Sequence, residues 1–164
     1  MGHCRRRHGR DRRRAPTSVR PSASGTYVTG YCFDTDILSA TIRPAPPLHL
    51  IRRLATVPPQ EQFTTSITVG ELIYGARRVG REDLSRRVEQ LVHRAQTVLA
   101  FDTTAARTFG ALKATLERHG TPLAEPDLRI ASIVLSRGLI LVTRNVRHFQ
   151  RVPELTVENW IDEP

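Results

Sequence analysis

The chain has 164 residues, which is long enough for one domain with a sizeable core and too short for a second catalytic domain. Its formal net charge is +9, but residues 1–25 hold eight Arg against one Asp, and the remaining 139 residues carry only +2. Most of the positive net charge therefore lies in the first 25 residues, and it does not by itself indicate a nucleic-acid-binding domain. No segment approaches the roughly 18 apolar residues of a membrane span, which predicts a cytoplasmic protein.

Residues 1–25 form a basic segment of Arg, Ser, Pro and Gly without an apolar run. We expect this segment to be disordered, because it cannot bury enough surface to offset the entropy of ordering. Its Arg pairs are not followed by the hydrophobic stretch of a secretory or twin-arginine signal. Two interpretations stay open: a natural arm that grips RNA, and upstream sequence included by a mistaken start site.

The cysteines and the first histidines do not predict a disulfide or a zinc site. Cys4 lies in the basic segment and Cys32 in an apolar run, so both thiols are expected to be reduced. His3, Cys4 and His8 do not provide four well-spaced ligands, which favours a solvated arm.

Short β-rich runs alternate with amphipathic stretches of helix length from residue 27 to residue 162. This alternation is typical of βα units around a parallel sheet, and we interpret 27–162 as one domain. Strands are expected at residues 27–33, 62–67, 97–101, 139–143 and 156–160.

Helices are expected between these strands, with Pro and Gly at their ends. The expected ranges run from 36 to before Pro44, then 48–55, 68–78, 83–95, 103–119 and 126–137. The helix at 103–119 has the clearest apolar face and is followed by Gly120, and we expect Asp102 to cap its start. The helix at 126–137 is apolar on nearly all sides and leads into a strand that suits burial on both faces.

Four oxygen-bearing residues stand where predicted elements begin or end: Asp34, Glu71, Asp127 and Asn145. Residues at such boundaries can converge at one rim of a parallel sheet, which is where open α/β folds bind their ligands. Mg²⁺ prefers hard oxygen ligands and is usually held by one or two carboxylates together with waters and substrate phosphate. The pattern therefore indicates a magnesium-dependent nuclease with one site built from distant segments.

Each of these residues also has a purely local interpretation. Asp34 is equally suited to capping the helix that follows it. Glu71 fits a capping box that begins at Thr68, and the local pattern favours that role. Asp127 would be stabilised in any first helical turn, and Asn145 would normally be a turn residue.

The conjunction of these residues resembles the PIN-domain ribonucleases, in particular the VapC-type toxins of bacterial toxin-antitoxin pairs. The matching strings run in the family's order from about Tyr31 to Trp160: FDTDILS, SITVGELIYGARR, VLAFD, GTPLAEPDLRIAS and LILVTRNVRHFQRVPELTVENW. The resemblance implies a three-layer α/β/α fold with a central, mostly parallel sheet of four to five strands.

The resemblance also implies a site for Mg²⁺ or Mn²⁺, with Asp34 and Asp127 as direct ligands. Glu71 would hold a metal-bound water or act as a base, and Asn145 would orient a ligand or water. Two positions depart from the family pattern: Asp36 stands where Asn is common, and Asn145 stands where many members have Asp.

The implied reaction is hydrolysis of RNA to 5'-phosphate and 3'-hydroxyl ends. Single-stranded or looped RNA is the expected substrate, because its bases are accessible. Basic residues adjacent in sequence to the acids are the candidate substrate contacts, although a solvated surface is an equal alternative for each; they are Arg77, Arg129, Arg144, Arg147 and His148.

The resemblance further implies a cognate VapB-type antitoxin and a homodimer. The apolar residues from Leu48 to Leu54 could face a partner or the core. Two alternatives stay open: a catalytically silent PIN-like module that binds RNA or antitoxin, favoured by Asn145, and a haloacid-dehalogenase-like phosphatase that uses Asp34 and Asp36. The phosphatase is disfavoured because Lys113, the only lysine, lies within an amphipathic helix.

Overall fold

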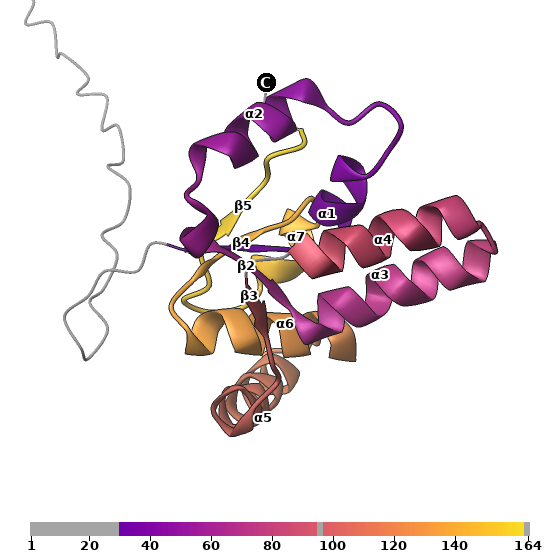
Figure 1. Cartoon of the computed structure of the whole chain (residues 1–164). Coiled ribbons are helices and arrows are strands. Elements are labelled where there is room, and N and C mark those ends of the chain that lie inside the picture. The colour runs from indigo at the N-terminus through magenta and orange to yellow at the C-terminus, as the bar shows by residue number, and fades with distance from the viewer. Residues whose placement is uncertain (1–29, 95–96, 163–164) are drawn as a thin grey trace, which may run out of the picture.

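Five short parallel strands form the centre of the fold in this computed structural model, which describes residues 30–94 and 97–162 (Figure 1). The strands are β1 (Tyr31–Phe33), β2 (Gln62–Thr65), β3 (Thr97–Leu99), β4 (Ile140–Val142) and β5 (Val157–Glu158). They pair in the order β3-β2-β1-β4-β5, and every pairing is parallel. The order places the first strand at the centre, between β2 and β4, so the chain winds outward in both directions from β1.

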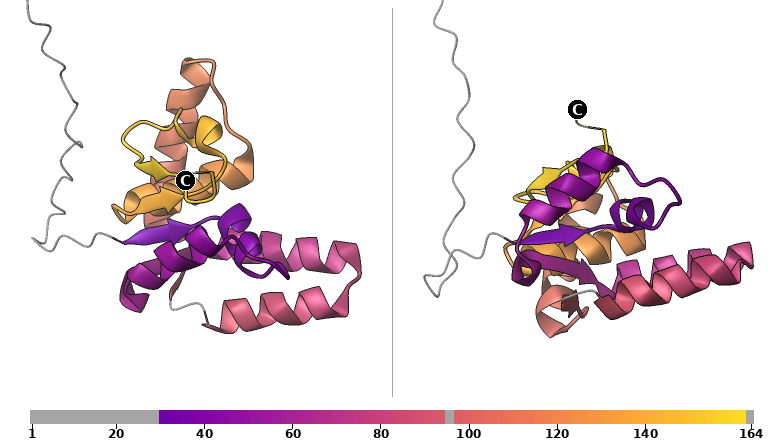
Figure 2. Two further views of the ribbon diagram at one scale, coloured as in Figure 1. Left: turned by 90° about the horizontal axis from the view of Figure 1, so that it is seen from above. Right: turned by 45° about the horizontal axis from the view of Figure 1, so that its top comes forward.

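Helices cover both faces of this sheet, which confirms the predicted three-layer α/β/α fold (Figure 2). They are α1 (Thr35–Thr41), α2 (Leu48–Thr56), α3 (Ser66–Val79), α4 (Glu82–Arg94), α5 (Thr103–Arg118), α6 (Glu125–Ser136) and α7 (Val146–Phe149), with a 3-10 turn at Pro59–Glu61.

The side chains of the central strands point alternately to the two faces of the sheet, and each face packs against its own set of helices. Cys32 and Leu141 point into a core built with α5, α6 and α7, whereas Phe33 and Val142 point into a core built with α1 and α2. Successive side chains of a strand point to opposite faces, so two neighbouring apolar residues on each strand bury both sides of the sheet. A third, smaller cluster joins α3 and α4, which form a hairpin that extends beyond the sheet (Figure 2).

The start of α3 differs from the sequence prediction. Strand β2 ends at Thr65 and the helix begins at Ser66, two residues earlier than the predicted start at 68. The hydroxyl of Thr65 accepts a hydrogen bond from the backbone N–H of Thr68 at 3.0 Å and is the N-cap. Because Thr65 supplies this cap, the predicted capping box from Thr68 to Glu71 is wrong.

Most other boundaries agree with the prediction within a few residues. Asp102 caps α5 as expected, with Oδ1 accepting from the N–H of Ala105 at 2.9 Å. Gly120 has a φ of +65°, the left-handed conformation that glycine adopts easily after a helix. The short helix α7 was not predicted, and β5 is shorter than expected.

Strand β1 begins at Tyr31. Residues 27–29 of the predicted strand, Cys4 and the whole basic segment 1–25 lie outside the described residues.

Cys32 is free and fully buried, and burial raises the pKa of its thiol far above its ordinary value. In the residues that the structure describes, no helix is both long and apolar enough to cross a membrane.

Candidate active site at the carboxyl edge of the sheet

Three of the four predicted site residues follow the central strands β1, β2 and β4, and the fourth lies on α6. Asp34 directly follows β1, and its backbone N–H donates to the carbonyl of Val142 at the end of β4, at 3.0 Å. Glu71 lies on α3, the helix that follows β2, and Asn145 lies between β4 and α7. Asp127 is in the first turn of α6.

Asp34 is a buried carboxylate whose hydrogen-bond donors in the described part of the chain are uncharged. Its side chain is held by two donors: the N–H of Thr35 at 2.7 Å and the hydroxyl of Thr143 at 2.8 Å. Its exposed fraction is 7%. Burial, and to a lesser degree the nearby charges of Asp36 and Glu71, raise the pKa of Asp34 from 3.8 to about 6, against the lowering effect of its two hydrogen bonds. Asp34 therefore caps α1 and is also the centre of a group of acids.

Glu71 belongs to this group and does not cap its own helix. The hydroxyl of Thr35 donates a hydrogen bond to Oε2 of Glu71, which joins α3 to the start of α1. This contact spans 36 positions in the chain. The carboxylate of Glu71 is thus positioned beside Asp34, where the two charges interact.

Asp36 connects α1 to the turn after β4. Its Oδ2 accepts from the backbone N–H of Arg144 at 2.9 Å and from the hydroxyl of Thr143 at 3.4 Å. Its Oδ1 is buried and has no hydrogen-bond partner in the structure. Burial is the main cause that raises the pKa of Asp36, although its hydrogen bonds lower it.

Asp127 and Asn145 form a second group, which is centred on His148. Nδ1 of His148 lies 3.2 Å from Oδ2 of Asp127 and 2.8 Å from Nδ2 of Asn145. Thr143 links this group to the first one, because its hydroxyl oxygen also accepts the backbone N–H of Asn145 at 3.1 Å. The four predicted residues therefore belong to two adjoining groups joined through Thr143.

Thr35 and Thr143 were missed by the sequence analysis, although both organise the site. Thr143 is fully buried and contacts Asp34, Asp36 and the backbone of Asn145. The only sequence signal was its position at the end of a buried strand, immediately before the turn that carries Asn145.

The donor set fits a hard divalent cation. The buried oxygen of Asp36 lacks a partner, and Asp34 is buried among like charges that a cation would neutralise. Within residues 30–94 and 97–162, no three His, Cys, Asp or Glu side chains are close enough to hold a metal by themselves. This arrangement still suits Mg²⁺, which keeps several waters and is commonly bound by one or two carboxylates.

The basic residues predicted as substrate contacts differ in their surroundings. Arg144 donates to Oδ2 of Asp162 at 3.2 Å, and Arg129 forms an ion pair with Glu125 one helical turn away. Arg147 is exposed on α7, and Arg77 is exposed in the last turn of α3. His148 alone among the five contacts two of the predicted site residues.

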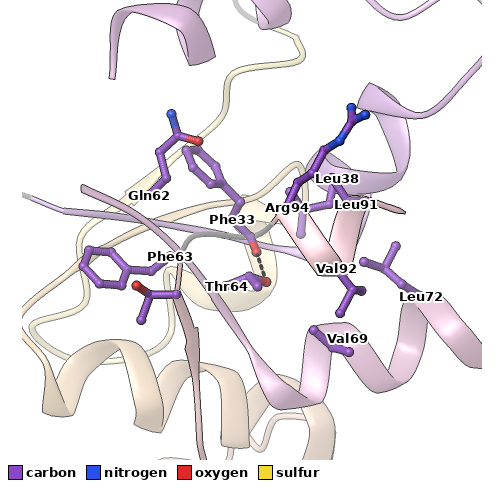
Figure 3. A pocket seen from close by; sticks show the side chains of 11 residues that line it. Phe33, Leu38, Gln62, Phe63, Thr64, Val69, Leu72, Leu91, Val92 and Arg94 are labelled. Carbon is purple, nitrogen blue, oxygen red and sulfur yellow. Dashed lines mark hydrogen bonds between the residues drawn. The ribbon is translucent and has the colours of Figure 1, made fainter. Parts of the chain in front are cut away.

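A mainly apolar cavity of about 220 Å³ lies between β2, α1, α3 and α4, apart from the acids (Figure 3). Phe33, Leu38, Leu72 and Val92 line it, and Thr64 donates to the carbonyl of Phe33 at 3.0 Å. None of the four predicted site residues lines this cavity. The sheet edge, and not the cavity, therefore carries the candidate chemistry.

An all-parallel α/β/α fold with acids after β1, on α3 and on α6, and an amide after β4, defines the class of protein. The chain belongs to the PIN domain family, which it matches over residues 31–155. This membership argues against the haloacid-dehalogenase-like alternative.

Its relatives are VapC proteins, as the sequence resemblance indicated. The chain is 37% identical over 131 residues to a tRNA(fMet)-specific endonuclease VapC of Salmonella typhimurium, covering 79% of this chain and 97% of that one. It is 35% identical to a ribonuclease VapC2 of Haemophilus influenzae, with coverages of 80% and 98%. The solved structure of DNA-bound VapBC from Salmonella typhimurium matches with a TM-score of 0.68 at 36% identity, covering 80% of this chain and 98% of that one.

Proposed function

We propose that the protein is an endoribonuclease that requires Mg²⁺ or Mn²⁺ and acts as the toxin of a toxin-antitoxin pair. The observation that carries the proposal is the buried Asp34, held by Thr35 and Thr143 beside Asp36 and Glu71. A buried carboxylate next to like charges is costly in a protein without a cation, so such an arrangement is typical of a functional site. The names of the VapC relatives support ribonuclease chemistry.

Asp34 and Asp127 are the residues that would hold the cation, and Glu71 would hold a water or accept its proton. When bound, the cation would lower the pKa of a coordinated water and neutralise charge on the phosphate. Thr35 fixes the Glu71 carboxylate through its hydroxyl. Thr143 fixes Asp34 and the backbone of Asn145 at the same time, so the two halves of the site keep one geometry.

The proposed substrate is single-stranded or looped RNA, which is approached from the open carboxyl edge of the sheet. Arg144 lies on the turn after β4 and Arg147 on α7, and both would contact the phosphates of the RNA. An RNA substrate is consistent with action in the cytoplasm.

The proposed partners are a VapB-type antitoxin and a second copy of this chain. The solved structures of relatives from Salmonella typhimurium and Rickettsia felis are VapBC complexes. On α2, Leu50 is buried in the core, whereas Leu48 is 68% exposed and Ile51 is 37% exposed, so this helix has apolar surface on both sides. Co-purification with a small protein from the adjacent gene, and light scattering of the chain alone, would test the two partners separately.

The central test is cleavage of a defined mixture of RNAs by the purified protein, with and without added Mg²⁺ or Mn²⁺. We expect cleavage that needs the cation and is lost in Asp34→Asn and in Asp127→Asn. Asp102→Asn is the matched control, because Asp102 caps α5 away from the site and its cap acceptor is retained. Cation-independent cleavage, or equal cleavage by Asp34→Asn, would contradict the proposal.

A catalytically silent module that binds RNA or antitoxin is the second candidate. Two observations favour it: Asn145 carries no charge, and no three His, Cys, Asp or Glu side chains gather closely enough to hold a metal in the described part of the chain. The same assay decides between them, because a silent module would bind RNA in a gel-shift experiment and yield no product with either cation.

A further inference from the structure

We propose that His148 contributes a nitrogen ligand to the cation site, and that the site therefore prefers Mn²⁺ to Mg²⁺. This inference rests on the proposed function, because it concerns the cation that the proposed nuclease would use. It starts from the surroundings of one atom, Nδ1 of His148, which lies 3.2 Å from Asp127 Oδ2 and 2.8 Å from Asn145 Nδ2.

The two close contacts of Nδ1 are with groups of opposite kinds, a carboxylate oxygen and an amide nitrogen. A neutral imidazole nitrogen carries either one hydrogen or one lone pair. With a hydrogen, Nδ1 suits the carboxylate of Asp127 and opposes the amide N–H groups of Asn145. With a lone pair, it suits the amide and opposes the carboxylate. A half-turn of the amide replaces its nitrogen by its oxygen, and a single hydrogen on Nδ1 is then shared between two acceptors.

A cation satisfies all three side chains together. The carboxylate oxygen, the imidazole lone pair and the amide oxygen are each possible ligands. Ligands that lie roughly 2.1 Å from one ion, at right angles to each other, are about 3 Å apart. The distances of 2.8 Å and 3.2 Å around Nδ1 bracket this separation.

The positions of the three residues in the fold suit an open coordination site. Asp127 is in the first turn of α6, and Asn145 and His148 are at the start of α7, so two elements far apart in sequence supply the donors. The side chain of His148 is 49% exposed and that of Asp127 is 22% exposed. Waters and a substrate phosphate can therefore complete the coordination of an ion bound there.

An imidazole ligand changes which cation is preferred. Mg²⁺ takes oxygen ligands almost exclusively, whereas imidazole suits transition metals, and affinity for mixed nitrogen and oxygen sites increases along the first row from Mn²⁺ onward. A site with only Asp34, Asp127 and Asn145 would offer oxygen alone. His148 is thus the residue that gives this chain a preference for Mn²⁺.

The test measures binding of each cation to the full chain without RNA. Isothermal titration with Mn²⁺ and with Mg²⁺ is carried out on the wild type, on His148→Gln, and on His119→Gln as the matched control. His119 is exposed at the end of α5, where its backbone N–H bonds to the carbonyls of Thr115 and Glu117. We expect His148→Gln to weaken Mn²⁺ binding about tenfold or more, to change Mg²⁺ binding by less than about twofold, and the control to match the wild type.

Electron spin echo spectroscopy of bound Mn²⁺ provides a second measurement on the wild type itself. We expect modulation from a coordinated nitrogen, which His148→Gln removes. If both cations bind with the nitrogen signal absent, or if the variant weakens Mn²⁺ and Mg²⁺ equally, the inference about His148 is overturned while the proposed nuclease stands. If neither cation binds the wild type, both proposals fail.

Discussion

Replacing Asp34 by Asn should stabilise the cation-free protein at neutral pH, although Asp34 is central to the site. The pKa of Asp34 is raised from 3.8 to about 6, mainly by burial. Each pKa unit corresponds to about 1.4 kcal/mol, so the ionised side chain costs the folded state about 3 kcal/mol above pH 7, as an upper value. Asn keeps an acceptor for the N–H of Thr35 and removes the charge.

The sign of the pH dependence follows from this raised pKa. Below pH 3.8 the side chain is protonated in both states and its cost is absent. As the pH rises from 3.8 through about 6, Asp34 ionises freely only in the unfolded chain. The free energy of unfolding therefore falls across that range. Between pH 5 and pH 7.5 the wild type should lose about 1.4 kcal/mol more than Asp34→Asn.

Urea denaturation at pH 5 and pH 7.5, with a chelator present, measures this difference directly. Titrating groups that do not interact with Asp34 are common to both proteins and cancel in the comparison, so the difference reports Asp34 together with its neighbours Asp36 and Glu71. Asp102→Asn is a suitable control, because the N–H of Ala105 and nearby Arg137 lower the pKa of Asp102, so its loss should not stabilise the protein. An Asp34→Asn protein that is less stable than the wild type at pH 7.5, or that has the same pH dependence, would refute the reasoning.

Three other substitutions or treatments have defined outcomes. Thr143→Val should lower the free energy of unfolding by about 1–3 kcal/mol, because it leaves buried Asp34 without one of its donors, whereas Thr143→Ser should restore most of it in the same urea experiment. Thr65→Ala should cost about 1 kcal/mol through loss of the α3 cap to the N–H of Thr68; an unchanged midpoint would contradict that role, and Thr65→Ser should behave as the wild type. Cys32 should react with a thiol reagent only as fast as the protein unfolds, because it is fully buried and the pKa of its thiol is raised. Mass spectrometry identifies the labelled cysteine. Rapid labelling of Cys32 in native conditions would show that strand β1 is more accessible than the structure indicates.

Local sequence patterns were sufficient for a parallel sheet with helices between its strands, and the three-layer arrangement followed from the family resemblance. The apolar pairs Cys32–Phe33 and Leu141–Val142 lie on strands buried on both faces, and alternation along a strand requires helices on each side of the sheet. The caps and stops at Asp102 and Gly120 depend on neighbours within a few residues. Such features are determined by backbone sterics and hydrogen bonds between adjacent residues, so they can be predicted from the chain alone.

The sequence also indicated which residues to examine at the sheet edge, through their placement at element boundaries and the resemblance to the PIN-domain proteins. It could not show how they are held. A local rule assigned Glu71 to its own helix, but its partner is the hydroxyl of Thr35, 36 positions away. No pattern in the chain indicated that one buried hydroxyl, that of Thr143, would join Asp34 to Asn145.

The amino-acid sequence by itself thus determined the strands and most helix ends, and it indicated which residues to examine at the edge of the sheet. Only the tertiary structure decided that Thr65 caps α3, that His148 lies against Asp127, and that Asp34 is buried enough for its pKa to rise to about 6. The physical reason is that caps and periodicity depend on neighbouring residues, whereas desolvation and long-range hydrogen bonds depend on which distant segments are packed together.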